Sequence, residues 1–235
     1  MRIAVDLHMH SCLSPCGDES MTPYNIAAMA SIKGLDVIAV ADHNACGNAR
    51  AISTACARFG VTLLPAMEVT SREEVHLLCY FPSLSPLEAF GREIYAHLPD
   101  VKNRAEIFGP QVLMDAEDQQ LGLEERMLLG AVQLSAEQIQ ALALAHGGVM
   151  VPAHINKHAN SWLDILGFIP PQMHLNTVEV FARAPVAAYV KLDQYRVLHN
   201  SDAHQLEDIL ERESFLEVDE VSAPALVDLF ARAKG

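Results

Sequence analysis

The chain has 235 residues, of which 51% are hydrophobic and 20% are charged. This length and composition are typical of one compact globular enzyme and exclude a disordered or fibrous chain. No apolar run approaches the ~18 residues that span a bilayer, and the first residues lack the pattern of a signal peptide. We therefore expect a single domain over residues 1–235, a cytoplasmic location and no membrane partner.

The charge is strongly acidic. Thirty Asp and Glu residues against 16 Lys and Arg residues give a formal net charge of −14. Such a charge repels a long polyanion, so the sequence predicts no extended nucleic-acid surface. A small phosphorylated substrate is still compatible, because divalent cations bound at an active site would make that site locally positive.

The cysteine pattern indicates reduced thiols. The cysteines are odd in number and show no CxxC spacing, so neither a disulfide framework nor a structural zinc knuckle is expected. They are Cys12, Cys16, Cys46, Cys56 and Cys79.

Short apolar runs alternate with segments of helical periodicity along the chain. The predicted strands cover residues 2–7, 36–41, 61–66, 75–81, 149–153, 176–181, 196–200 and 214–218. The main predicted helices cover residues 22–33, 48–59, 86–98, 135–146, 185–192 and 222–233, and the fourth begins with a capping box. This alternation favours an irregular parallel α/β barrel.

Residues 99–134 fit the alternation least well, because they are rich in Glu, Asp and Gln. We interpret them as a helical insertion. It would form a lid or a wall of a pocket, or else a solvent-exposed helical segment outside the pocket.

Metal-ligating residue types recur where the predicted strands end. His8 and His10 follow the first strand, and alternate residues of an extended chain point the same way. In a parallel barrel the C-terminal strand ends meet on one face, where such enzymes place their catalytic groups. Each residue alone could instead cap a helix or form a hydrogen bond in the core. The full set is His8, His10, His43, Glu68, His76, His154, Asp202 and His204.

Four ordered motifs resemble those of the PHP (polymerase and histidinol phosphatase) superfamily, over nearly the whole chain. They are Asp6-Leu7-His8-Met9-His10-Ser11, Ala41-Asp42-His43-Asn44, Pro152-Ala153-His154 and Ser201-Asp202-Ala203-His204. The resemblance implies a distorted (β/α)7 TIM-like barrel that binds up to three divalent metals and hydrolyses phosphoesters.

The same resemblance implies three ligand sets. The first ion would be held by His8, His10, Glu68 and Asp202, the second by Glu68, His76 and His154, and the third by Asp18, His43 and His204. Cys16 and Glu19 are neighbouring alternatives to Asp18. Asp18 is preferred because the family's ligand in this loop lies four residues before the threonine that starts the helix, here Thr22.

Imidazoles mixed with carboxylates suit Zn, Mn or Fe better than Mg or Ca. A hydroxide bridging two such ions, held by the first ligand set, is the predicted nucleophile. Lys157, Arg183 and Arg72 follow strands and are predicted to bind the phosphate, although each could be a solvated surface charge.

The sequence therefore predicts a metal-dependent phosphoesterase acting on a small phosphorylated metabolite, or on the end of a nucleotide or oligonucleotide. Two alternatives remain at this stage. One is a metal-dependent hydrolase of a non-phosphate bond, such as an amide, and the other is a non-catalytic metal-binding regulatory module.

Overall fold

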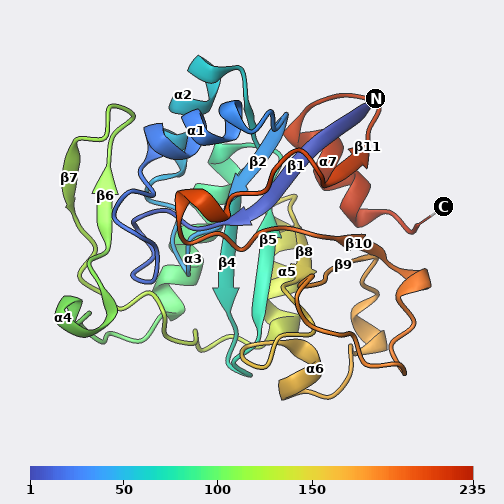
Figure 1. Cartoon of the computed structure of the whole chain (residues 1–235). Coiled ribbons are helices and arrows are strands. Elements are labelled where there is room, and N and C mark those ends of the chain that lie inside the picture. The colour runs from blue at the N-terminus through green and yellow to red at the C-terminus, as the bar shows by residue number, and fades with distance from the viewer. Residues whose placement is uncertain (235) are drawn as a thin grey trace.

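The computed structural model describes residues 1–234, and its mixed α/β fold confirms the predicted class (Figure 1). Its strands are β1 (Arg2–Met9), β2 (Val37–Val40), β3 (Thr62–Leu63), β4 (Ala66–Thr70), β5 (His76–Tyr80), β6 (Val112–Met114), β7 (Gln120–Leu123), β8 (Val149–Pro152), β9 (Thr177–Glu179), β10 (Arg196–Leu198) and β11 (Phe215–Glu217). Its helices are α1 (Pro23–Ile32), α2 (Ala49–Phe59), α3 (Leu84–His97), α4 (Ala105–Phe108), α5 (Ala136–Ala145), α6 (Trp162–Ile165) and α7 (Ala223–Ala231).

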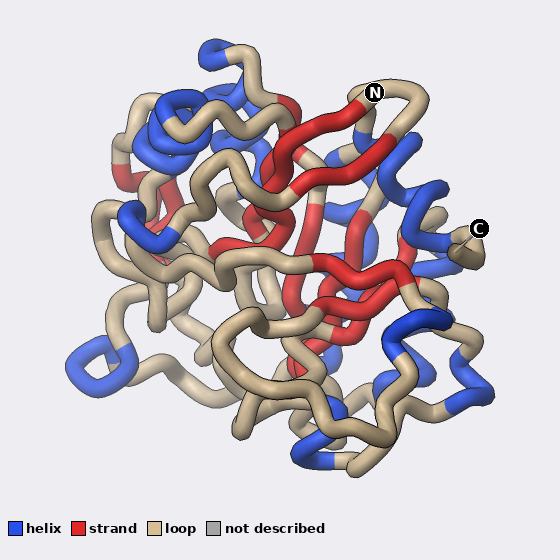
Figure 2. Tube along the Cα trace, turned by 45° about the vertical axis from the view of Figure 1, so that its right-hand side comes forward, coloured by secondary structure: helices blue, strands red, loops and turns tan. Residues whose placement is uncertain are grey.

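The strands form four hydrogen-bonded sheets, with orders β11-β1-β2-β3, β4-β5-β8, β9-β10 and β6-β7. The prediction of parallel pairing is wrong for β11, which runs antiparallel to β1, and for β5, which runs antiparallel to both β4 and β8. For β4 and β5 the reason lies in the connection, because residues 71–75 are too few for the crossover that joins parallel neighbours. The central strands lie together with helices around them (Figure 2).

Isolated contacts join these sheets at the strand ends. His43 forms a parallel bridge with Glu68, and Met9 forms another with Ala203. The segments that follow β1, β2 and β10 and the middle of β4 are therefore held side by side. These are the segments that carry most of the predicted ligands.

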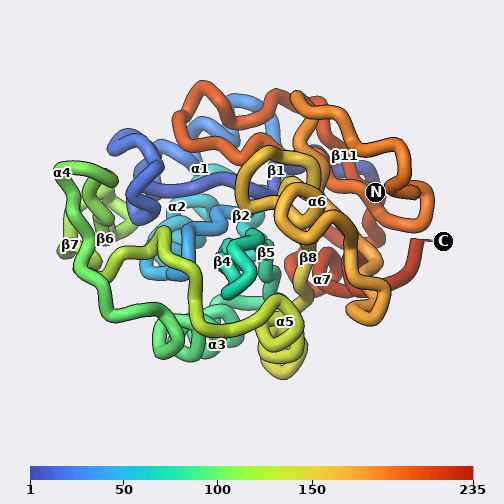
Figure 3. Tube along the Cα trace, turned by 90° about the horizontal axis from the view of Figure 1, so that it is seen from below, coloured from blue at the N-terminus to red at the C-terminus, as the bar shows by residue number. Residues whose placement is uncertain are grey.

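One hydrophobic cluster lies between the strands and is closed by α7. It contains Leu7 of β1, Ala39 of β2, Leu78 of β5 and Val151 of β8, and Phe230 of α7 packs against it. Two further clusters lie under α3 and α5 and under α1 and α2. Figure 3 shows these helices on opposite sides of the strands. The strand ends that carry polar residues are thus fixed by a packed core.

One local prediction about the helices is confirmed and another is wrong. The capping box at α5 is confirmed, since Ser135 and Gln138 exchange side-chain and backbone hydrogen bonds. The helix predicted over residues 185–192 is wrong, because the only helical turn near it is a 3-10 turn at Leu192–Gln194.

The helical insertion predicted over residues 99–134 is also wrong. Only α4, with four residues, is helical there, and β6 and β7 form an antiparallel hairpin. Its turn is built by the Asp115 carboxylate, which accepts hydrogen bonds from the backbone N–H groups of Glu117 and Gln119. Asp118 adopts φ 59°, and such an Asx turn competes with helix formation.

The hairpin is anchored beside the loop that follows β1. Val112 N donates to Cys12 O at 2.9 Å, and the Asn48 side chain bonds both Val112 O and Met114 N. Among residues 1–234, no helix combines the length and apolar character needed to cross a membrane.

Candidate metal centre

Glu68 lies at the centre of a cluster of imidazoles. It is 1% exposed in the middle of β4. Its Oε1 lies 2.9 Å from His76 Nδ1, 3.2 Å from His154 Nε2 and 3.3 Å from His8 Nε2. Its Oε2 lies 3.0 Å from His43 Nδ1. One carboxylate therefore faces donors from four different segments of the chain.

Asp202 supplies a second carboxylate on the other side of His8 and His10. Asp202 Oδ1 lies 3.4 Å from His8 Nε2 and 3.2 Å from His10 Nε2. His10 Nε2 is also 3.5 Å from Glu68 Oε2. These four residues form the first of the three predicted ligand sets.

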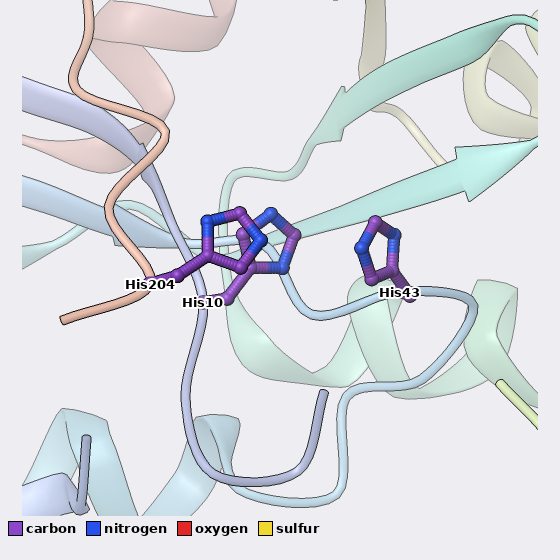
Figure 4. Close-up of side chains that lie close together, drawn as sticks. All are labelled: His10, His43 and His204. Carbon is purple, nitrogen blue, oxygen red and sulfur yellow. The ribbon is translucent and has the colours of Figure 1, made fainter. Parts of the chain in front are cut away.

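The imidazoles of His10, His43 and His204 lie close together (Figure 4). The ring of His10 stacks against each of the other two, with its centroid 4.4 Å from theirs. One nitrogen from each ring lies within 4.8 Å of the others. Together with the contacts of Glu68 and Asp202, the structure brings together eight of the nine predicted ligands.

Among residues 1–234, four buried ring nitrogens have no hydrogen-bond partner: His8 Nε2, His10 Nε2, His43 Nδ1 and His154 Nδ1. Carboxylate oxygens lie 3.0–3.3 Å from the first three without forming hydrogen bonds to them. An unsatisfied buried donor or acceptor costs about 1–3 kcal/mol. Imidazole nitrogens and carboxylate oxygens at these separations fit a divalent metal between them, so the residues present match the group that the sequence implies.

The protonation states of the metal-free cluster follow from its charges. Burial alone would raise the pKa values of Glu68 and Asp202, but neighbouring histidines hold both well below the usual range. Burial opposes the charged form of His43, yet Glu68 raises its pKa to about 10. His10 is the exception, because burial and the neighbouring His43 lower its pKa well below the usual range.

Glu179 is a buried carboxylate at the cluster that the sequence does not single out. Both of its carboxylate oxygens lie 3.0 Å from His8 Nδ1. It also accepts hydrogen bonds from His154 N at 2.7 Å and from Asn200 Nδ2 at 2.7 Å. Carboxylates in this position orient a ligating histidine and fix its tautomer. A signal was present, since Glu179 is an acidic residue inside the apolar strand predicted over residues 176–181.

Asp42 holds the loop that follows β1. It accepts hydrogen bonds from Ser11 N, Ser11 Oγ and Ser14 Oγ, at 2.6–2.8 Å. Ser14 Oγ in turn lies 3.1 Å from His10 Nδ1. The Nδ1 atoms of both His8 and His10 thus have protein partners, which directs their Nε2 atoms toward Glu68 and Asp202.

Asp18 is the predicted ligand that the structure does not bring into the cluster. Its carboxylate is exposed and accepts a hydrogen bond from Ser20 N at 2.8 Å. Cys16, in the same loop, is exposed. Partial burial raises the pKa of its thiol, but the neighbouring His204 and His43 have the larger combined effect and lower that pKa to about 7.

The three predicted phosphate-binding cations lie in different places. Lys157 reaches the site, where its Nζ contacts Asp202 Oδ2 and lies 4.8 Å from the centre of the Phe181 ring. Arg183 is exposed, and Arg72 pairs with its neighbour Glu73 at 3.8 Å. Within residues 1–234, neither arginine forms a hydrogen bond or ion pair with a predicted ligand.

A cavity of about 640 Å³ is lined in part by the segment that follows His43. Its walls include Asn44, Arg50, Arg92, Tyr95 and Leu113, so the β6-β7 hairpin contributes one wall. The segment 99–134 therefore does line a pocket, although not as a helix.

No protein-family model matches the sequence, and a search of curated proteins finds no relative. Solved structures share its fold. Endonuclease Q from Pyrococcus furiosus superposes with a TM-score of 0.69 and 22% identity over 98% of this chain. A complex of Endonuclease Q with a 27-mer duplex substrate, with an abasic lesion at the active site, gives a TM-score of 0.67 and 23% identity over 97% of this chain. This chain spans 56% of the length of both of those chains.

Two further structures match over nearly their whole length. A protein from Bifidobacterium adolescentis, named as a candidate metal-dependent phosphoesterase, gives a TM-score of 0.60 and 18% identity over 92% of this chain and 93% of its own. An amidohydrolase from Chromobacterium violaceum with bound sulfate gives a TM-score of 0.57 and 18% identity over 98% of this chain and 97% of its own.

These comparisons correct the prediction about the partner. The expectation of a small phosphorylated substrate and no extended nucleic-acid surface is wrong, since two matched structures are of an endonuclease and one of them holds a duplex. The physical reason is that net charge is an average over the whole surface, whereas a polyanion meets only the local potential near the site.

Proposed function

We propose that this chain is a metal-dependent phosphodiesterase that cleaves nucleic acid. The observation that carries this proposal is the arrangement around Glu68, whose two oxygens face four imidazoles from different segments. The fold shared with Endonuclease Q supports a nucleic-acid substrate rather than another phosphoester.

We assign the ions as up to three divalent cations, Zn, Mn or Fe. One is held by His8, His10, Glu68 and Asp202 and a second by Glu68, His76 and His154, while His43 and His204 contribute to a third. Divalent ions held by such groups polarise a phosphoryl oxygen and supply a nucleophile at neutral pH.

The protein residues around the ions have separate tasks. Glu179 and Ser14 fix the rings of His8 and His10 through Nδ1, so that Nε2 is presented to the cluster. Lys157 brings a positive charge to the rim of the site at Asp202, where it can bind a phosphate of the substrate.

The local charge distribution supports the approach of a polyanion. Residues 155–200 contain four basic and three acidic residues, whereas the rest of the chain contains 12 basic and 27 acidic ones. This segment connects two of the proposed ligands, His154 and Asp202, and its Lys157 contacts Asp202. A nearly neutral segment repels a polyanion less than the acidic remainder of the chain does.

We further propose that β1, β2, β4, β5, β8, β9 and β10 form a distorted seven-stranded barrel. The parallel bridges of His43 with Glu68 and of Met9 with Ala203 connect neighbouring sheets. Ile155 N donates to Glu179 O at 2.9 Å and joins β8 to β9 in the same way. Six of these strands also contribute to the one cluster that α7 closes.

The proposal can be tested with labelled oligonucleotides. Purified protein loaded separately with Zn, Mn or Fe is incubated with single-stranded and duplex oligonucleotides, with and without an abasic site. We expect strand cleavage that a chelator abolishes. His10→Ala should lower kcat about a hundredfold or more, because losing an ion removes several kcal/mol of transition-state stabilisation.

His97→Ala is the matched control, since His97 is an exposed histidine at the end of α3. It should leave cleavage unchanged. The proposal fails if protein shown to contain metal cleaves no oligonucleotide, or if His10→Ala keeps full activity. Turnover of an amide panel by such protein would support the non-phosphate alternative instead.

A further inference from the structure

Asn160 meets His76 at two points, although the two residues are 84 positions apart in the sequence. Its Nδ2 lies 2.9 Å from His76 Nε2, and its backbone O accepts a hydrogen bond from His76 N at 2.9 Å. The other ring nitrogen, Nδ1, lies 2.9 Å from Glu68 Oε1. The imidazole of His76 is therefore held at both nitrogens, with Nδ1 facing the cluster and Nε2 facing the loop that follows β8.

This loop is fixed by contacts outside the cluster. The side chain of Asn156 donates to Phe181 O at 2.9 Å and accepts from Phe181 N at 2.8 Å. Trp162 is fully buried, and its Nε1 donates to His76 O at 3.3 Å. Asn160 itself adopts φ 55°, a left-handed conformation that asparagine tolerates better than most residues. The backbone thus presents the Asn160 amide to the ring in a defined position.

A comparison with His8 shows what this contact does. His8 has a partner, Glu179, on its Nδ1, and its Nε2 faces Glu68. His76 is turned the other way round, because its Nδ1 faces Glu68 and its Nε2 meets Asn160. A ligating histidine commonly bonds a second group through its remaining ring nitrogen, and this bond fixes the orientation and the tautomer of the ring.

We propose that Asn160 is a positioning residue that holds His76 with Nδ1 directed at the second proposed ion. This inference rests on the proposed metal centre and names the support of its second site. In the orientation that the structure shows, the amide nitrogen can only donate, so Nε2 accepts and Nδ1 carries the ring proton toward Glu68. With an ion on Nδ1, the ring proton resides on Nε2, and a half-turn of the amide places its oxygen there as the acceptor. Asparagine offers both groups, so it can hold the ring with and without an ion.

Metal affinity tests the proposal without measuring activity. Asn160→Gly removes the amide but allows the left-handed backbone. We expect it to weaken the binding of one zinc ion per chain by about 10–100-fold, measured by competition with a chromophoric chelator, and to leave the other ions near the wild-type affinity. Asn160→Asp keeps an acceptor for the Nε2 proton and should recover most of the affinity. His174→Gly is the matched control, since His174 is exposed, has φ 48° and lies outside the cluster.

Two results of this measurement would overturn the proposal. One is equal affinity of Asn160→Gly and the wild type for every ion. The other is a loss in Asn160→Gly that affects all ions equally and that Asn160→Asp does not recover, because such a loss would mean that the residue only supports the fold.

Nuclear magnetic resonance of the zinc-loaded protein gives a second readout. Nitrogen-15 chemical shifts distinguish a ring nitrogen that binds a metal from one that carries a proton, and the signals of this ring are those missing from His76→Gln. We expect His76 to bind zinc through Nδ1 and to carry on Nε2 a proton that exchanges slowly with water. This exchange should become fast in Asn160→Gly. Zinc on Nε2 would overturn the proposal, as would slow exchange that persists in Asn160→Gly.

The outcomes separate this inference from the proposed function. If the wild type binds no metal, the metal centre itself fails and the role of Asn160 fails with it. If the wild type binds zinc and cleaves oligonucleotides but Asn160→Gly binds every ion as tightly, only the role of Asn160 is wrong. If the selective loss in Asn160→Gly is found in a protein that cleaves no oligonucleotide, the proposed function fails and the role of Asn160 stands.

Discussion

Glu179 holds His8 through both carboxylate oxygens, each 3.0 Å from Nδ1. His8 therefore presents Nε2 to Glu68 and Asp202, at 3.3 Å and 3.4 Å. The pair is fully buried, so water cannot replace the carboxylate. The histidine most central to the proposed site is thus oriented by a residue that touches no proposed ion.

Glu179→Gln should weaken metal binding while leaving every proposed ligand in place. The amide keeps the size of the carboxylate but loses the charge that raises the pKa of His8. Changes at such supporting residues cost about 10–100-fold in metal affinity. Competition with a chromophoric chelator measures the loss. Glu125→Gln, at an exposed position, is the control, and equal affinity in both variants would show that Glu179 has no orienting role.

Glu68→Gln should destabilise the metal-free protein. Glu68 faces His8 and His43, whose pKa values are both raised, so the substitution leaves buried positive charge without its partner. Removing one member of a buried ion pair costs about 3–5 kcal/mol. Urea unfolding in the presence of a chelator gives the difference. A loss below about 1 kcal/mol would mean that these histidines are neutral in the metal-free state.

Metal binding should release protons and should strengthen as the pH rises. The pKa of His43 is raised from 6.5 to about 10 in the metal-free protein, because Glu68 favours its charged form despite burial. A ligating nitrogen must be unprotonated, so at neutral pH an ion has to displace this proton. Between pH 6.5 and 10 the apparent affinity should rise by about tenfold per pH unit for this one proton.

Calorimetry in buffers with different ionisation enthalpies counts the released protons. His43→Ala should release one proton fewer per chain than the wild type at pH 7.5. Metal binding whose affinity is constant across this range would contradict the raised pKa of His43.

Lys157→Met should weaken the binding of nucleic acid and have little effect on the stability of the fold. Lys157 lies on the rim of the site, beside Asp202 and over the face of Phe181. If it contacts one phosphate, its loss should reduce the slope of log affinity against log salt by about one. Fluorescence anisotropy with a labelled duplex measures that slope. Arg72→Met is the control, and an unchanged slope in Lys157→Met would place this cation outside the interface.

The first strands of the chain could be predicted from the sequence because a short apolar run is a local signal. The run before His8 and His10 and the run before Asp42 are short and apolar, and both form buried strands. By contrast, the direction of β5 and the hairpin at residues 99–134 could not be predicted. The first depends on which strands meet across the molecule, and the second on side chains such as Asp115 that bond the backbone of their own turn.

The sequence by itself determined which residue types could form a metal centre, because His, Asp and Glu recur where strands end and such ends converge. Only the tertiary structure decided where the predicted loop ligand lies. The backbone N–H of Asp18 bonds His204 O and its carboxylate accepts a hydrogen bond from Ser20 N, so the side chain stays exposed and does not join the histidines. That choice depends on hydrogen bonds between segments almost 190 residues apart, which no local pattern can encode.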